Sequence, residues 1–474
     1  ADNNFLTKQV IIMKKKYFTN IFLLAMLILF ATSPLQAQSW TTYDELTMHN
    51  DMKTDVQYQK VRQYKSNFPI GVGNQLGGNQ FFFTKWKGIN NTVEQFCLND
   101  TNIIVSDFTI LGDTLYFCGK RLNIQTNNYD GIIGRISVYE CFSNYNPNYE
   151  VVTINSVQNL TKLVAYYLDE YRVNIVAIGD NGLSTTLPGR VVRLNAEINN
   201  SNLNCETLLC AYISTTQKEI MHDICLLEDK IATVSRIYPD DRYIVRYYPL
   251  DNNFTNTFSC MYNFQNITFN TTSHPYDYPL HIAKITKDVL AVGVSAMSGS
   301  FNFTMLNLLL KDTTIVLPSH FVMHENKDNK LLEMEYSTYQ KKLLMLHSNF
   351  FESHGTQQTI CFIDPNEDST YIAFLNYLTT QNQLNHFSII SNDKYAVAGV
   401  YKYYPSYPTQ LLGISTMEEY PYFCSNYEKT DVFISNLSNG VTILDLTIPN
   451  NPNVNWSTIQ GYFDNSNLNV DCHD

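Results

Sequence analysis

Asp288-Val-Leu-Ala-Val-Gly293 is one of six similar stretches, each with a polar residue, a short apolar run and a closing residue that is small in five of them. A short apolar run bounded by turn residues is typical of a buried β-strand. The closing residues stand 60, 56, 58, 54 and 52 positions apart, so one unit recurs along the chain. The stretches are Thr114–Gly119, Asn174–Gly179, Lys230–Ser235, Asp288–Gly293, Lys342–His347 and Lys394–Gly399.

Each stretch has further strand patterns on both sides. Before the third stretch lies Asp223-Ile-Cys-Leu-Leu227, and after the second lies Gly189-Arg-Val-Val-Arg-Leu194. The turns between the first two strands are short and polar, as in Leu111-Gly112-Asp113, which is typical of β-hairpins. Each unit is therefore predicted to be an antiparallel sheet of three or four strands.

Tandem sheets of this kind resemble the blades of β-propellers of the kelch and WD repeat class, in which radial stacking buries both faces of every sheet. The likeness covers roughly residues 75 to 450 and points to no specific family, because neither the WD dipeptide nor a double glycine recurs in the six units. The resemblance implies an all-β fold, a β-propeller with seven blades of three- to four-stranded antiparallel sheets. Six or eight blades are the alternatives.

The two ends of the repeat region predict how the ring closes. Residues 80–98 read as the outer two strands of a blade that lacks its start, and residues 430–448 supply strands that have no later partner. We expect these ends to pair, so that residues 79–474 form a single propeller domain closed by N- and C-terminal strands. Residues 38–78 are expected to be an N-terminal arm.

Residues 13–37 have the three-part order of a secretory signal peptide: Met13 with three lysines, an apolar run, and a small-residue cleavage site ending at Ala37. The run is shorter than the ~20 residues of a transmembrane helix. We therefore expect export, to the periplasm, cell surface or medium of a Gram-negative bacterium, with no transmembrane segment after signal removal. Residues 1–12 are expected to be non-native upstream sequence or the edge of a fragment.

The composition limits the class of function. A chain with 44% hydrophobic and 16% charged residues is not disordered. Its net charge of −12, which becomes −15 without residues 1–37, argues against a nucleic-acid binder, because phosphate contacts require a basic face. The ten cysteines permit disulfides after export, but buried free thiols are an equal alternative for Cys118 and Cys225, which lie in apolar runs.

Candidate ligand-binding residues come from the strand that should line the axis of the propeller. Counting twelve positions back from each closing residue gives acids, a histidine and aromatic residues, with His222 and His386 one position earlier in their units. Side chains at equivalent positions should converge near the axis. The candidate axial site comprises Asp107, Asp223, His281, Glu335 and His386.

Two interpretations of these axial residues remain open. Mixed histidine and carboxylate ligands suit divalent cations, and a cation such as calcium is the one cofactor that the sequence allows. Alternatively, the same side chains hydrogen-bond neighbouring blades and satisfy buried backbone groups. An enzyme, such as a glycan hydrolase or lyase with Asp107, Asp223 and Glu335 as acid and base, is the rival to a non-catalytic module.

Tyrosine-rich segments between the second and third strands are the candidate docking loops. Exposed tyrosines suit protein partners or stacked sugars, and loops at the ends of a scaffold commonly carry binding residues. We therefore predict a monomeric binding or scaffold module for protein or carbohydrate partners. The residues predicted to contact the partner are Tyr238, Tyr243, Tyr401, Tyr403, Tyr404 and Tyr407.

Overall fold

The computed structural model describes most of the repeat region. By contacts the chain divides into residues 1–42 and 43–474, and every described residue lies in the second unit. The expected signal peptide therefore lies outside the described residues. These are residues 56–65, 68–75, 81–86, 92–98, 100–139, 148–154, 157–180, 189–198, 208–212, 218–238, 242–250, 258–263, 280–298, 301–311, 319–323, 328–351, 355–363, 369–374, 383–391, 394–404, 407–416, 427–435, 440–443 and 454–467.

The described strands form seven consecutive antiparallel sheets, each ordered from its first strand to its last. Sheet 1 contains β1 (Val56–Tyr64), β2 (Phe68–Gln75), β3 (Phe81–Trp86) and β4 (Thr92–Leu98). Sheet 2 contains β5 (Ile103–Leu111), β6 (Thr114–Asn123), β7 (Asn128–Ser137) and β8 (Asn148–Ile154). Sheet 3 contains β9 (Asn159–Tyr167), β10 (Arg172–Asp180), β11 (Arg190–Glu197) and β12 (Leu208–Tyr212).

The remaining sheets follow the same order. Sheet 4 contains β13 (Lys218–Leu226), β14 (Lys230–Tyr238), β15 (Arg242–Pro249) and β16 (Phe258–Asn263). Sheet 5 contains β17 (Leu280–Lys284), β18 (Val289–Ser298), β19 (Phe301–Leu310) and β20 (Ser319–Met323). Sheet 6 contains β21 (Asp328–Ser337), β22 (Lys342–Phe351), β23 (Gly355–Ile363) and β24 (Ser369–Phe374). Sheet 7 contains β25 (Gln383–Ser391), β26 (Lys394–Tyr404) and β27 (Tyr407–Thr416).

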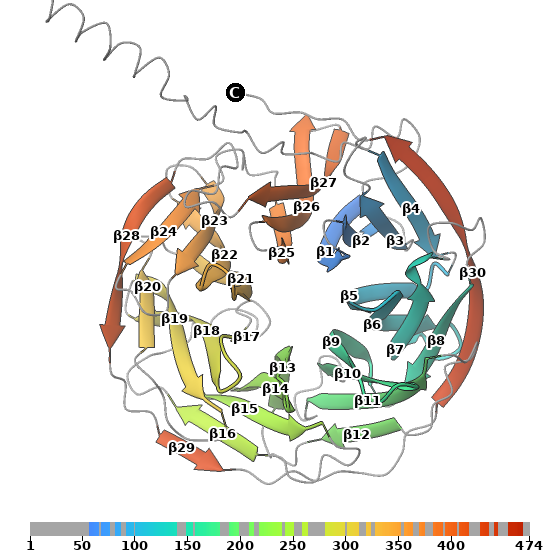
Figure 1. Ribbon diagram of the computed structural model, residues 1–474, viewed down its shortest axis with the longest axis horizontal. Helices are drawn as coiled ribbons and strands as arrows, with labels where there is room; N and C mark the ends of the chain where they lie inside the picture. Colours follow the sequence, from blue (N-terminus) through green and yellow to red (C-terminus); the bar gives the residue numbers. More distant parts are fainter. Residues whose placement is uncertain are drawn as a thin grey trace, which may run out of the picture. The chain divides into compact units, whose positions relative to one another are not determined.

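The first strands of the seven sheets contact one another in a closed series. Strand β1 contacts β5, the series continues through β9, β13, β17 and β21 to β25, and β25 contacts β1 again. Figure 1 shows these first strands nearest the centre of the ring and later strands of each sheet farther out. This arrangement confirms the predicted all-β propeller with seven blades of three or four strands.

The hydrophobic core is divided into clusters between successive sheets. One cluster joins Val192 and Ile175 of sheet 3 with Val152 and Tyr116 of sheet 2, and another joins Val234 of sheet 4 with sheet 5. Each sheet is thus covered on both faces by its neighbours. A central strand such as β10 is therefore mainly apolar, as in residues 174–179. Of the thiols in the described residues, Cys118 and Cys225 are free, as one of the two alternatives predicted.

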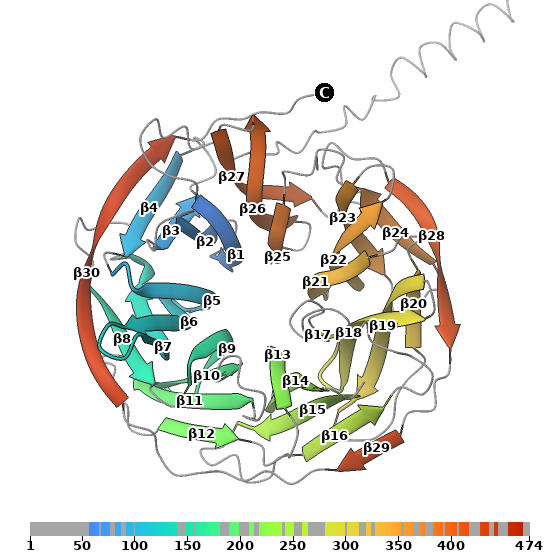
Figure 2. The same ribbon diagram turned by 180° about the vertical axis from the view of Figure 1, so that it is seen from behind.

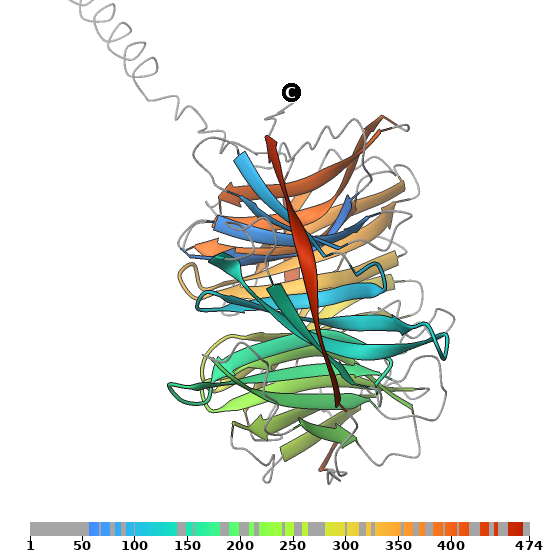
Figure 3. The same cartoon turned by 90° about the vertical axis from the view of Figure 1, so that its right-hand side faces the viewer.

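Three C-terminal strands lie outside the seven sheets, as Figure 2 shows. Strand β28 (Tyr427–Ser435) pairs with β20 and β24, and β29 (Gly440–Ile443) pairs with β16. Strand β30 (Val454–Asn467) pairs with both β4 and β8 and crosses the outer edges of sheets 1 and 2 (Figure 3). No helix among the described residues is both long and apolar enough to cross a membrane.

The predicted closure of the ring is wrong in its details. Residues 56–75, expected to lie in an N-terminal arm, form β1 and β2, which are the missing start of the sheet that contains β3 and β4. The C-terminal strands therefore do not complete a composite blade; they add to the outer edges of sheets that are already formed. The polar sequence of β1, with Lys60 and Arg62, conceals it because a buried strand is expected to be apolar.

A β-bulge in the first strand explains the closing glycines of sheets 2 and 3. In sheets 2 and 3 the register shifts beside Val105 and Leu160, which pair with Gly119 and Gly179. A Cβ atom at either glycine would collide with the backbone carbonyl oxygen of the first strand, at Ile104 in one sheet and at Asn159 in the other. Gly119 and Gly179 are therefore required for steric reasons.

Candidate functional site

Six inner strands present a charged or imidazole side chain immediately after the bulge. Each of these residues pairs with the residue one position before the closing residue of the second strand, for example Asp107 with Cys118 and Asp223 with Val234. All six therefore occupy the same place in their sheets. They are Lys60, Asp107, Lys162, Asp223, Glu333 and His386.

Glu333 is the centre of a buried ionic cluster. Its Oε2 lies 3.2 Å from the Nζ of Lys60, 3.3 Å from the Nζ of Lys162 and 3.0 Å from the Nε2 of His386. These groups come from sheets 1, 3 and 7, whereas Glu333 belongs to sheet 6. One carboxylate thus connects four blades across the axis.

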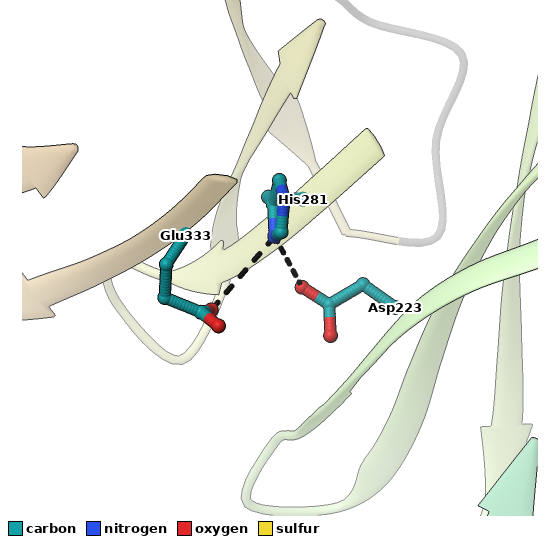
Figure 4. A group of neighbouring side chains, drawn as sticks. All are labelled: Asp223, His281 and Glu333. Atoms are coloured by element: carbon teal, nitrogen blue, oxygen red, sulfur yellow. Dashed lines mark ion pairs between the residues drawn. The ribbon is translucent and has the colours of Figure 1, made fainter. Parts of the chain in front are cut away.

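Asp223 and His281 complete the cluster on the side of sheets 4 and 5. Lys162 Nζ lies 3.3 Å from Asp223 Oδ1, so the same ammonium group contacts two carboxylates. The Nδ1 of His281 lies 3.4 Å from Asp223 Oδ2 and 3.8 Å from Glu333 Oε1. Figure 4 shows this edge of the imidazole facing both acids.

The charges in the cluster stabilise one another. Burial would raise the pKa of Glu333, but Lys162, Lys60 and His386 together lower that pKa well below its usual value. Burial also opposes the charge on Asp223, and Lys162 outweighs it, lowering the pKa of Asp223 to about 2. Burial lowers the pKa of Lys162, yet Asp223 and Glu333 raise it overall. Both acids are therefore ionised and matched by the two lysines at neutral pH.

His386 connects the last blade to the first. Burial and the charge of Lys60 lower the pKa of His386 well below its usual value, so its ring is neutral. Its Nδ1 accepts a hydrogen bond from the backbone N–H of Val61 at 3.4 Å, and the neighbouring Asn385 donates its side-chain N–H to Tyr58 O at 2.7 Å. These contacts join sheets 7 and 1, between which none of the described strands is shared.

Hydrogen bonds of the same kind occur between other blades. Asp107 Oδ2 accepts from the N–H of Leu163 at 3.1 Å, and Asp223 Oδ2 accepts from Ile282 at 3.1 Å. The guanidinium of Arg62 also lies 3.5 Å from Asp107 Oδ1. The interpretation of the axial acids as groups that satisfy neighbouring backbone therefore fits the geometry of both aspartates.

Glu335 lies two residues beyond Glu333 and has a different environment. Its Oε2 accepts a hydrogen bond from the N–H of Ile389 at 2.8 Å. Burial raises the pKa of Glu335 to about 7, and Arg62 only partly offsets that effect. Glu335 is therefore placed between sheets 6 and 7 and is the one predicted acid with a raised pKa.

Counting along the sequence missed Lys60, Lys162 and Glu333. The hairpin between β9 and β10 is longer than that between β5 and β6, so a fixed count of twelve reaches Tyr167 instead of Lys162. The same effect in sheet 6 selects Glu335 instead of Glu333. Lys162 and Glu333 could have been found from the register across each hairpin, which depends on the turn length and the bulge.

The prediction that six tyrosines form an exposed docking surface is not confirmed. Tyr243 is fully buried in the cluster between sheets 4 and 5, and its hydroxyl accepts a hydrogen bond from Asn307 at 3.2 Å. Its assignment to a docking loop is therefore wrong, because it lies in β15 and faces the next blade. The other five lie in strands β14, β26 and β27 with side chains outside the described part: Tyr238, Tyr401, Tyr403, Tyr404 and Tyr407.

A different group of tyrosines is exposed, and we call it the tyrosine patch: Tyr139, Tyr167 and Tyr171, with exposed fractions of 73%, 54% and 66%. The hydroxyl of Tyr167 lies over Gly112 in the β5–β6 turn. Tyr139 follows Val138, whose N–H donates to Asp113 O in that turn, and Tyr171 lies in the β9–β10 turn. The patch therefore occupies the same end of sheets 2 and 3.

No protein-family model matches this chain, and no curated protein matches it significantly. Among solved structures it is similar to a structure described as the β-propeller domain of the Trilobed protease from Pyrococcus furiosus, with an open velcro topology. The sequence identity is 10%, the TM-score is 0.39, and the match covers 78% of this chain and 96% of that chain. The fold assignment rests on the strand pairing and inner-strand contacts given above.

Proposed function

We propose that this protein is an exported β-propeller that serves as a binding and scaffold module for protein or carbohydrate partners. The observation that carries this proposal is the neutralisation of the axial acids. Glu333 and Asp223 contact lysine ammonium groups, and Asp107 contacts Arg62 and the N–H of Leu163. Glu333 and Asp223, whose pKa values are lowered by these contacts, hold blades together as carboxylates and are poor proton donors.

The tyrosine patch supports the part of the proposal that concerns binding. Its rings are large apolar surfaces exposed at one end of sheets 2 and 3. Tyrosine combines such a surface with a hydroxyl group that can hydrogen-bond a protein or a sugar. Export would bring the patch into contact with cell-envelope or extracellular material, and the signal-like segment at residues 13–37 supports that location.

One observation favours the alternative of a glycan hydrolase or lyase. The pKa of Glu335 is raised to about 7 by burial, and a carboxylic acid that stays protonated near neutral pH can act as a general acid. Against this role, its Oε2 already accepts a hydrogen bond from the backbone of Ile389. The two proposals therefore predict different consequences for the Glu335→Gln variant.

The test measures binding and turnover in the same samples. Soluble cell-envelope polysaccharides and a panel of envelope proteins would be tested for binding, and the polysaccharides for release of reducing ends or unsaturated products. The patch variant carries Tyr139→Ser, Tyr167→Ser and Tyr171→Ser. The control carries Ile124→Ser and Tyr129→Ser, which are exposed at the opposite end of β6 and β7.

If the protein is a binding module, we expect at least one ligand whose affinity falls at least tenfold in the patch variant and is unchanged in the control. We also expect no product to be released. Product release by the wild-type protein that disappears in Glu335→Gln would show that the protein is an enzyme and would overturn the proposal of a non-catalytic module. Absence of binding to both panels, or equal loss in the patch variant and the control, would contradict the proposal.

A further inference from the structure

His281 is a buried side chain that lacks hydrogen-bond partners within the described part of the protein. It is 3% exposed, and neither ring nitrogen has a hydrogen-bond partner among the described residues. Its strand also differs from the other six inner strands, because β17 pairs with β18 without a bulge. Leaving a buried imidazole without partners is unfavourable, so an additional group at this position has to be considered.

The atoms around His281 have the separations of a coordination shell. Nδ1 lies 3.4 Å from Asp223 Oδ2 and 3.8 Å from Glu333 Oε1, and one ligand atom from each residue lies within 4.8 Å of the others. Ligands bound tetrahedrally at ~2.0–2.2 Å from one zinc ion are separated by about 3.4 Å. A separation of 3.8 Å is too long for a hydrogen bond but is compatible with a shared ion.

We propose that Asp223, His281 and Glu333 bind one divalent transition-metal ion, of which zinc is the best representative. One imidazole nitrogen and two carboxylate oxygens suit zinc better than calcium, which prefers oxygen ligands alone. The ion would connect β13, β17 and β21, the inner strands of three consecutive blades. Its role is therefore to join sheets 4, 5 and 6 at the axis (Figure 4).

Lys162 contacts different carboxylate oxygens from those that face His281, but its charge competes with that of an ion. Lys162 contacts Asp223 Oδ1 and Glu333 Oε2, whereas His281 faces the other oxygen of each acid. An ion and Lys162 can thus share both carboxylates. Lys60 and Lys162 already balance the two acids, so a dication adds positive charge to a buried site. Removing the charge of Lys162 should therefore strengthen metal binding.

The experiment uses the full chain, free of any affinity tag and stripped with a chelator. Zinc, manganese and calcium binding would be measured by titration calorimetry, with elemental analysis of the dialysed protein and circular dichroism to confirm folding. We expect one zinc ion per chain, weaker binding of manganese and none of calcium. We also expect zinc to raise the melting temperature of the wild-type protein.

Three variants make the assignment specific. His281→Gln should weaken zinc binding at least tenfold, and Lys162→Met should strengthen it at least tenfold. His222→Gln is the matched control: it changes a half-buried histidine that precedes Asp223 in β13 and is outside the three-residue group, and it should leave the affinity within twofold. Absence of stoichiometric zinc binding by the folded wild-type protein would overturn the proposal, as would equal affinity in His281→Gln or binding of calcium alone.

Discussion

The Nζ of Lys162 lies 3.3 Å from the Oε2 of Glu333, although 171 positions of sequence separate the two residues. The first belongs to sheet 3 and the second to sheet 6, which are not neighbours in the ring. The ion pair therefore forms only when the inner strands converge on the axis. The charges at the axis are therefore balanced only when the ring is closed.

Replacing Lys162 with methionine should lower the free energy of unfolding by about 3 kcal/mol, because two buried carboxylates lose their shared cation. Chemical unfolding at neutral pH, in the presence of chelator, measures this difference. The matched control is Lys284→Met, whose ion pair with Glu228 is largely exposed and should contribute less than ~1 kcal/mol. Equal losses in the two variants would contradict the role assigned to the axial cluster.

Glu335 should make the stability fall as the pH rises. Its pKa is raised from 4.5 to about 7 by burial, so between these values the unfolded chain has lost a proton that the folded protein retains. The sign follows directly: unfolding becomes easier from pH 4.5 to 7, by up to about 3 kcal/mol, and changes no further above that range. Glu335→Gln removes the titration and should abolish this part of the decline.

Unfolding of both proteins would be followed at half-unit intervals from pH 4 to 8. The difference between variant and wild type isolates Glu335, because the other titrating groups are shared. A difference that stays constant over the whole range would contradict the raised pKa.

The contact between sheets 7 and 1 should open more easily than that between sheets 5 and 6, because no described strand pairs with both sheet 7 and sheet 1. Asn385→Ala removes the hydrogen bond to Tyr58 O, and we expect faster amide exchange in β1 and β25 with a loss of ~1 kcal/mol. Ser295→Ala removes a comparable acceptor, of the Leu331 N–H, between sheets 5 and 6. Those sheets also share the outer strand β28, so their exchange should change less. A larger increase in amide exchange for Ser295→Ala than for Asn385→Ala would contradict this prediction.

Gly179→Ala should destabilise the protein by about 2 kcal/mol or more, because the added Cβ collides with the backbone carbonyl of Asn159 at the bulge. Gly189→Ala is the control, since its Cβ would meet the side chain of Met221 instead of a backbone atom, and a side chain adjusts at a lower cost than backbone. Thermal unfolding of the two variants distinguishes these cases. A similar melting temperature for both would show that the bulged strand can also adjust.

Much of the fold is readable from local patterns. The stretch Asp288–Gly293 and its five relatives mark the second strand of six sheets, and their spacing leads to a propeller. The first sheet is harder to recognise because β1 carries Lys60 and Arg62. Those partly buried charges contact Glu333 and Asp107 of other blades, and no local sequence pattern reveals such distant ion pairs.

The sequence by itself determined the repeat and, for sheets 2 to 7, the order of the first three strands and the inner strand on which the axial groups lie, because these depend on periodicity and short turns. It also identified Asp107, Asp223, His281 and His386 as residues of those strands. Only the tertiary structure decided which charges meet. Glu333 rather than Glu335 contacts Lys60 and Lys162, because bulges and hairpin lengths set the register and ring closure brings distant strands together.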